Sequence, residues 1–165
     1  MGVLTTGYSI TPPLMRKIRA DNDNLAFLLG TNQETEPIWK TIESYDFDKS
    51  FADIIGVLLQ CGYRRVYKLL DGEGYFYGEN SNYIDYDGYD IWFVTPSKVK
   101  FIVDELETVT LAKIKPIEET EPLTDYYNTI IPESLYENYL GYIEDMRRFF
   151  KKAAEKGNYL LFAEA

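Results

Sequence analysis

The strongest constraint on the fold is an amphipathic pattern near the carboxyl end of the chain. Apolar side chains recur at helical spacing between about Leu135 and Lys156, which predicts one long helix with a single buried face. Gly157 is the expected residue after the last helical turn, and the apolar run at 159–162 then predicts a central strand. The side chains predicted to face inward are Tyr139, Tyr142, Ile143, Met146, Phe149, Phe150 and Ala153.

Strand and helix patterns alternate along the rest of the chain. The sequence predicts an opening strand over 3–10, a helix over about 49–60, and a short strand at 91–94 that is covered on both faces. A further helix starts at Thr95-Pro96. No internal repeat or flexible linker interrupts residues 1–165. The alternation favours an α/β class of mixed α+β character: a single domain with one mixed sheet and helices packed on both faces. The inward residues of the 95-onward helix are Val99, Ile102, Val103 and Leu106.

Several helix ends carry recognisable signals. Thr11 is placed to cap a helix that begins with Pro12-Pro13, where the missing N–H groups do no harm. Asp46 and Asp48 precede the 49–60 helix, where the helix dipole favours negative charge, so helix capping is their predicted role. The basic residues at 147–152 either bind an anion or complement the dipole of the long helix, and we favour the dipole.

Charge limits the kinds of partner that this protein can have. Seventeen basic residues against 27 acidic ones give a formal charge of −10. Such a field repels nucleic acid and anionic lipid, so we expect neither as a partner; it fits either solubility alone or a basic protein partner. Cys61 is the single cysteine, which excludes an intrachain disulfide and suggests an inert buried thiol. Without a signal peptide or membrane span, the sequence favours the cytoplasm.

The chain contains no histidine, and this excludes several chemistries. A Ser-His-Asp triad, a Cys-His pair, a His-ligated zinc ion and an imidazole base are all impossible. The acidic run 85–90 lacks the glycine and glutamate spacing of a calcium loop. We therefore predict no catalytic residue, no metal site and no cofactor. An enzyme built on this chain would have to use carboxylates, tyrosines, lysines or arginines.

A Gly-, Asn- and Tyr-rich segment over 72–90 is the strongest candidate for a contact surface. Loops of this length inside a compact domain are commonly functional, and amphipathic aromatic side chains are typical of recognition surfaces. The alternative is a loop packed on its own tyrosines, and the sequence does not choose between them. The candidate binding residues are Tyr75, Tyr77, Tyr83, Tyr86, Asp87 and Tyr89.

Three segments carry a family resemblance: residues 46–51, 88–96 and 149–158, each leading into a predicted helix or strand. In this order the chain resembles the YfbM-like bacterial proteins, grouped as domain of unknown function 1877. The resemblance implies one α/β domain from a bacterial cytoplasm, with helices on both sides of a sheet, and it implies no activity or cofactor. Phe51 stands where a tryptophan is more usual, and Ile55 stands where many members are expected to carry a histidine.

Two hypotheses of function remain. The leading one is a non-catalytic binding or regulatory protein that uses an acidic, tyrosine-rich surface, and an antitoxin or immunity-type protein that neutralises a basic toxin is one specific form of it. The alternative is a small-molecule enzyme with carboxylates and tyrosines in a cleft. A deep cleft with two converging carboxylates would favour the enzyme, whereas an open acidic face with exposed tyrosines would favour binding. The sequence leaves the oligomeric state open.

Overall fold

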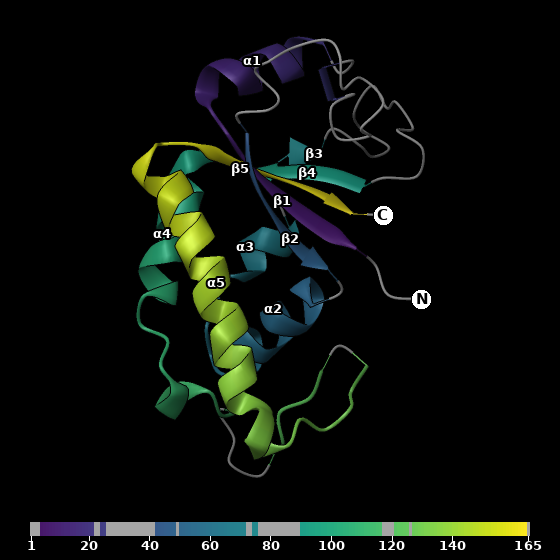
Figure 1. Cartoon of the computed structure of the whole chain (residues 1–165), viewed down its shortest axis with the longest axis vertical. Helices are drawn as coiled ribbons and strands as arrows, with labels where there is room; N and C mark the ends of the chain where they lie inside the picture. Colours follow the sequence, from purple (N-terminus) through teal and green to yellow (C-terminus); the bar gives the residue numbers. More distant parts are fainter. Residues whose placement is uncertain are drawn as a thin grey trace.

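One antiparallel sheet organises the chain. The computed structural model describes residues 4–21, 24–25, 42–48, 50–71, 74–75, 90–116, 121–125 and 127–164. The strands lie in the order β2-β1-β5-β4-β3, so the carboxyl-terminal strand is central, as predicted (Figure 1). Their bounds are β1 Thr5–Ile10, β2 Glu43–Asp48, β3 Gly74–Tyr75, β4 Asp90–Val94 and β5 Tyr159–Glu164.

The predicted class is confirmed, but the strand directions differ from the expectation of a mixed sheet. Every pairing among the described strands is antiparallel. Between β4 and β5, helix α4 (Pro96–Leu106) leads the chain away from the sheet and α5 (Tyr136–Glu155) brings it back beside α4 (Figure 1). Because the chain returns to the end of the sheet that it left, β5 runs antiparallel to β4. A single helix between them would have given a parallel pair.

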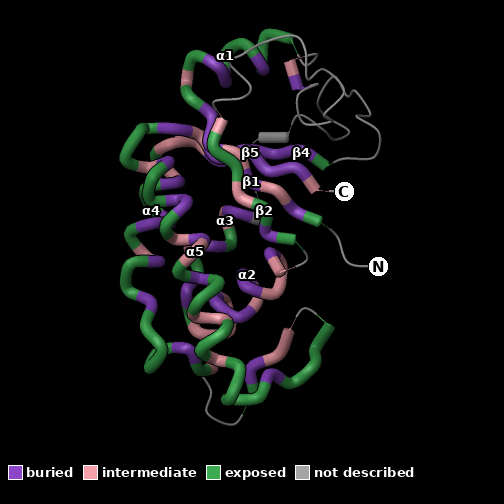
Figure 2. The backbone as a smooth tube through the Cα atoms, viewed as in Figure 1, coloured by how far each residue is buried: buried purple, intermediate pink, exposed green. Residues whose placement is uncertain are grey.

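Both faces of the sheet are covered, as predicted. The larger core lies under α2 (Phe51–Gln60), α3 (Tyr67–Asp71), α4 and α5. The smaller core lies under α1 (Pro12–Ala20) on the opposite face (Figure 2). Alternate residues of the central strands supply the two cores because successive side chains of a strand point to opposite faces. Trp92, Val94, Leu160 and Phe162 belong to the larger core, and Ile91, Phe93, Leu161 and Ala163 to the smaller one.

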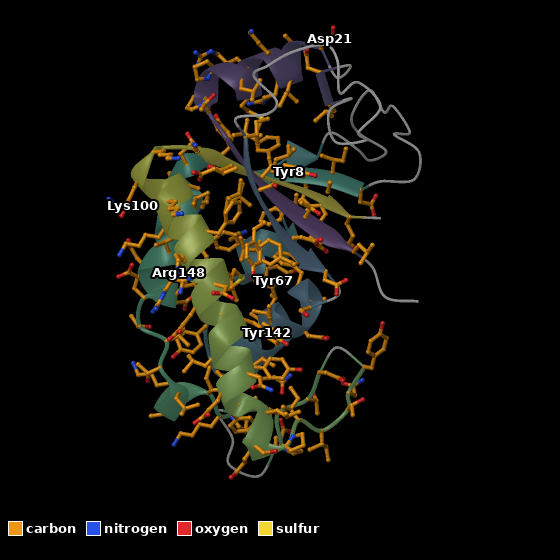
Figure 3. All side chains as sticks on the ribbon, viewed as in Figure 1. Tyr8, Asp21, Tyr67, Lys100, Tyr142 and Arg148 are labelled. Carbon is orange, nitrogen blue, oxygen red and sulfur yellow. The ribbon has the colours of Figure 1, made fainter. Side chains whose placement is uncertain are left out.

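Most of the local signals in the helices are confirmed. Thr11 caps α1, since its Oγ1 accepts a hydrogen bond from the Leu14 amide at 3.4 Å. Gly157 follows α5 with φ +66°, a left-handed conformation that favours glycine. The exception on α5 is Tyr142, which was predicted to face inward but is 46% exposed. It lies on the part of α5 that extends past the sheet (Figure 3), so less of the fold covers it.

Strand β2 was not predicted, and it changes the role of two acidic residues. Asp46 and Asp48 lie in β2 rather than capping α2, whose N-cap residue is Ser50 without a side-chain hydrogen bond. Asp46 Oδ1 instead accepts the Asp48 amide at 2.8 Å, and Asp48 has φ +50° where the strand ends. The pairing with β1 overrides the local helix-start signal. It also buries Phe47 in the larger core.

Candidate functional site

Most of the predicted tyrosine-rich segment lies outside the described residues. This is the case for Tyr77, Tyr83, Tyr86, Asp87 and Tyr89. Tyr75 is the last residue of β3, where its backbone pairs with Trp92, but its side chain is not described. The proposed contact role of these six residues therefore stays a prediction.

A second acidic, tyrosine-bearing surface lies within the described part, across α5, β2, α2 and the 123–131 segment. We call it the tyrosine–aspartate surface. Tyr139 and Tyr142 meet edge to face on α5, with ring centroids 6.1 Å apart. Tyr142 and Arg148 both project from α5 (Figure 3), and the helix becomes basic at Arg147 and Arg148. The residues of this surface are Tyr45, Tyr139, Tyr142, Asp46, Asp53, Asp125 and Asp145.

The electrostatics of the tyrosines show that the carboxylates lie close to them. Burial raises the pKa of Tyr139, and the negative charges of Asp53 and Asp125 raise it further. Burial likewise raises the pKa of Tyr45, with Asp145 as the next cause. These phenols stay protonated over the physiological range, so each offers an O–H donor and an aromatic face beside a carboxylate.

A sequence signal for this surface exists and was missed. Between residues 116 and 146 the chain contains no lysine or arginine, while the nearest basic residues are Lys115 and Arg147. The acidic residues of this interval are Glu118, Glu119, Glu121, Asp125, Glu133, Glu137, Glu144 and Asp145. The net charge of the whole chain does not reveal this interval. A profile of charge along the sequence would have revealed it.

A structured hairpin extends the surface beyond the first turns of α5. Asp125 Oδ1 accepts the amides of Tyr127 and Thr129, each at 2.8 Å, and this fixes the turn. The Gln60 side chain of α2 binds both the amide and the carbonyl of Thr124, at 3.0 and 2.9 Å. Tyr127 is 66% exposed on this braced turn. A large aromatic side chain is thus presented next to the carboxylate that faces Tyr139.

A shallow groove of about 350 Å³ lies at the β2 end of the surface. Tyr45 and Phe149 contact one another in its wall, with ring centroids 5.9 Å apart. Asp145 accepts a hydrogen bond from Arg148 at 3.3 Å at its rim. The groove therefore combines aromatic walls with a balanced set of charges. Its lining residues are Glu43, Ser44, Tyr45, Asp145, Arg148, Phe149 and Lys152.

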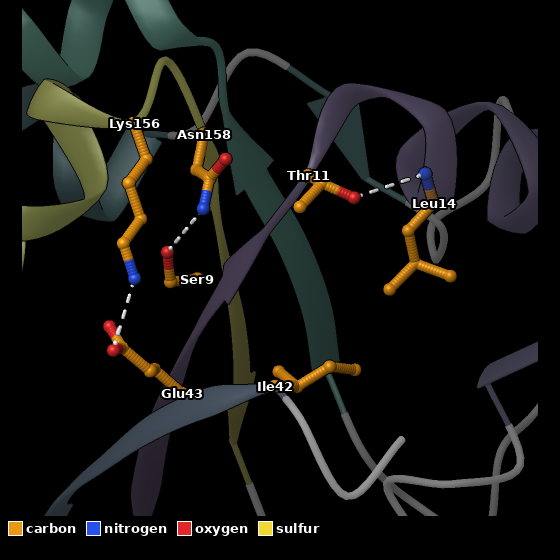
Figure 4. Close-up of a pocket in the computed structure, with 7 residues that line it drawn as sticks. All are labelled: Ser9, Thr11, Leu14, Ile42, Glu43, Lys156 and Asn158. Carbon is orange, nitrogen blue, oxygen red and sulfur yellow. Dashed lines mark hydrogen bonds and ion pairs between the residues drawn. The ribbon is translucent and has the colours of Figure 1, made fainter. Parts of the chain in front are cut away.

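A separate polar cavity of about 220 Å³ lies where the end of β1, the start of β2 and the turn between α5 and β5 meet (Figure 4). Lys156 Nζ donates to Glu43 Oε1 at 3.1 Å on one side. The Asn158 amide donates to Ser9 Oγ at 3.0 Å, and both of these residues are buried. Thr11, Leu14 and Ile42 complete the wall. None of these residues was singled out as a site from the sequence, because they lie far apart in the chain.

Two carboxylates that meet at the end of the sheet bear on the enzyme hypothesis. Asp90 and Glu164 are opposite each other on β4 and β5, and burial followed by the charge of Asp90 raises the pKa of Glu164. Neither residue lines the groove or the cavity. Within the described ranges, no three metal-ligating side chains gather. Cys61 is half-buried rather than buried, and desolvation raises its pKa to about 11, which disfavours the nucleophilic thiolate.

The fold defines a single-domain α/β protein built on one antiparallel sheet. The family model described as Domain of unknown function (DUF1877) matches residues 1–163, and the chain belongs to this family. The crystal structure of YfbM from Escherichia coli, a protein of unknown function, is similar, with a TM-score of 0.59. That alignment has 13% sequence identity and covers 98% of this chain and 99% of that chain, so it shows the fold alone. None of the curated proteins compared matches the chain.

The family comparison confirms the resemblance seen in the sequence. At Ile55, where the resemblance leads us to expect a histidine in many members, the side chain is fully buried in the larger apolar core. Phe51 is also buried there, in contact with Phe47 and Phe162. Both departures thus fall on core positions rather than on the surface, the groove or the cavity. Among the described residues, no helix combines the length and apolar character needed to cross a membrane.

Proposed function

We propose that this protein is a non-catalytic binding or regulatory protein whose tyrosine–aspartate surface captures a basic protein partner. The observation that carries the proposal is the setting of Tyr45, Tyr139 and Tyr142 among aspartates. Tyr139 and Tyr142 also lie within the 31-residue interval 116–146 that contains no basic residue. An antitoxin or immunity-type protein that neutralises a basic toxin is the specific form that this chemistry favours.

The chemistry of the surface suits a lysine- and arginine-rich partner. A guanidinium or ammonium group gains from a carboxylate and from the face of a tyrosine ring at the same time. The tyrosines also bury apolar area at small cost in conformational entropy. The braced hairpin holds Tyr127 and Asp125 in place before binding, which lowers the ordering cost that binding otherwise incurs.

The distribution of charge would also orient the partner. Helix α1 carries exposed Arg16, Lys17 and Arg19 at one end of the long axis, and the acidic interval lies at the other end (Figure 1). A basic partner is therefore attracted to the hairpin end and repelled from the α1 end. Steering of this kind accelerates association and weakens steeply with salt.

The test compares two exposed tyrosines. Tyr142→Ala removes a ring from the surface, and Tyr67→Ala removes a ring of similar exposure (52% against 46%) from α3, outside the surface. Each immobilised variant is used to capture proteins from the native host at ~50 mM NaCl, followed by elution at ~500 mM. We expect the wild type and Tyr67→Ala to capture the same basic protein, and Tyr142→Ala to lose at least 10-fold in affinity.

Two results would contradict the proposal. One is a captured protein that binds Tyr142→Ala as tightly as the wild type, which would place the contact elsewhere. The other is binding that does not change between low and high salt, because an acidic surface that recognises a basic partner must be screened. Thermal melts of all three proteins serve as the control for folding. Replacing exposed tyrosines is expected to change stability by no more than ~0.5 kcal/mol.

A further inference from the structure

We infer that the polar cavity in Figure 4 is a binding site for a small aliphatic carboxylate. The site is separate from the tyrosine–aspartate surface and does not depend on the proposed partner binding. It is formed by residues of β1, β2, α1 and the turn after α5, which only the fold brings together.

Three side chains of the cavity wall keep hydrogen-bond donors that their bonds to Asn158, Leu14 and Glu43 do not use. Ser9 Oγ accepts a hydrogen bond from the side-chain amide of Asn158, so the Ser9 hydroxyl can still donate its own proton. Among the described residues, no acceptor takes this proton. Thr11 Oγ1 accepts from the Leu14 amide and likewise keeps its O–H. Lys156 uses one N–H on Glu43 and retains two more. Two hydroxyl donors and an ammonium group therefore face a ligand that accepts hydrogen bonds.

The local charge favours an anion. Glu43 is the single acidic residue among the described residues of the cavity wall, and it is already paired with Lys156. Lys152, one helical turn before Lys156, lines the adjoining groove together with Glu43. Among the described residues that line the cavity and the groove, the basic Arg148, Lys152 and Lys156 outnumber the acidic Glu43 and Asp145.

The start of α1 argues against a phosphate as the anion. A helix N-terminus usually offers several free amides, which is the basis of phosphate binding there. In α1 the residues Pro12 and Pro13 have no N–H, and Thr11 already binds the Leu14 amide. Three side-chain donors match the two oxygens of a carboxylate better than the four oxygens of a phosphate.

The volume of the cavity and its apolar wall limit the part of the ligand that is not the carboxylate. A volume of about 220 Å³ is below the roughly 300–1,000 Å³ of pockets that hold drug-sized ligands, so the ligand is small. Leu14 and Ile42 supply the apolar surface of the wall, and Leu14 lies beside Thr11 and away from Lys156 (Figure 4). A short carboxylate such as butyrate, with six non-hydrogen atoms, fills such a space with its charged end on Lys156 and its alkyl end on Leu14 and Ile42.

The experiment is a ¹H–¹⁵N NMR titration of the full chain with sodium butyrate at constant ionic strength. Butyramide and butylammonium serve as the neutral and cationic probes of the same length. Titration to ~50 mM covers the millimolar Kd that a ligand of this size reaches. We expect saturable shift changes at Ser9, Thr11 and Asn158 with butyrate, and at least 10-fold weaker binding of the other two probes.

Three variants separate a built site from general attraction of an anion. Lys156→Gln should weaken butyrate binding at least 10-fold, and Lys156→Arg should restore it to within about threefold, since both charge and donor return. Lys151→Gln is the matched control, because Lys151 lies on the same helix but pairs with Glu107 at 2.9 Å and should leave binding unchanged. Lys156 is exposed, so these variants keep the fold, and their spectra verify it.

The inference is overturned by any of three results. These are shift changes that do not saturate or that miss the cavity residues, equal binding of butyramide or butylammonium, and Lys156→Gln binding butyrate as the wild type does. None of them affects the proposed capture of a basic partner, which is measured with Tyr142→Ala at the other end of α5. The two proposals therefore fail independently.

Discussion

Gly7 in β1 is expected to be a site where one added methyl group destabilises the protein. The strand passes directly beneath the aromatic part of the larger core. A Cβ on Gly7 would lie 2.9 Å from Phe47 Cε2 and 3.3 Å from ring atoms of Phe149 and of Phe162. A separation of 2.9 Å is well inside van der Waals contact, so a ring has to move.

The rings have little freedom to move. Phe47 lies within 6.4 Å of Phe149 and Phe162 and within 5.0 Å of Phe51, measured between ring centroids. Overpacking a filled core in this way costs ~1–3 kcal/mol. Alanine also lowers the conformational entropy of the unfolded chain, and this stabilises the folded state by ~0.4–1 kcal/mol. We therefore expect Gly7→Ala to lower the free energy of unfolding by about 1–2 kcal/mol, or the Tm by roughly 3–6 °C for a chain of this size.

The assay is urea unfolding followed by tryptophan fluorescence, because Trp92 stacks on Phe162 with centroids 5.4 Å apart. Gly56→Ala on α2 is the matched control, since a Cβ there meets nothing within 4 Å. In that helix interior the same substitution should stabilise by ~0.5–1 kcal/mol. Phe47→Leu in the Gly7→Ala background should recover part of the loss by removing the closest ring. The reasoning is refuted if Gly7→Ala matches or exceeds the wild type in stability.

Two further predictions concern ionisation. Because the folded pKa of Glu164 is raised by burial and by Asp90, the folded state binds this proton more tightly than the unfolded state, and stability is lost as the pH rises through the folded pKa. Glu164→Gln should therefore be more stable than the wild type at pH 7 in urea melts, with the difference disappearing at low pH; a difference that instead grows in acid would contradict this sign. The Cys61 pKa of about 11, against an ordinary 9.0, leaves about a hundredfold less thiolate at pH 8. Alkylation of Cys61 by iodoacetamide should be slower than that of glutathione by a similar factor in the folded protein, and the two should react alike in urea.

The sequence alone determined α1, α2, α4, α5 and the central strand, because their signals are local, whereas it did not predict the short helix α3. In α4 and α5 the spacing of apolar residues found most of the buried positions, including Ile102, Leu106, Met146 and Phe150. Thr11 and Gly157 marked helix ends because capping depends on neighbouring backbone groups. The apolar run at 159–162 predicted the central strand because residues covered on both faces have no polar alternation.

Tertiary structure decided whether Asp46 caps a helix or lies in a strand, whether Tyr142 is buried, and which distant residues contact each other. Asp46 has the same local sequence signal whether it caps a helix or lies in an edge strand, and only the pairing of β2 with β1 selects the strand. Tyr142 follows the apolar spacing of α5, yet it is exposed because that part of the helix extends past the sheet. Ser9 and Asn158 are 149 residues apart and share a hydrogen bond. Contacts at such separations depend on the packed sheet and on α5, so local sequence patterns carry no signal for the cavity that these contacts form.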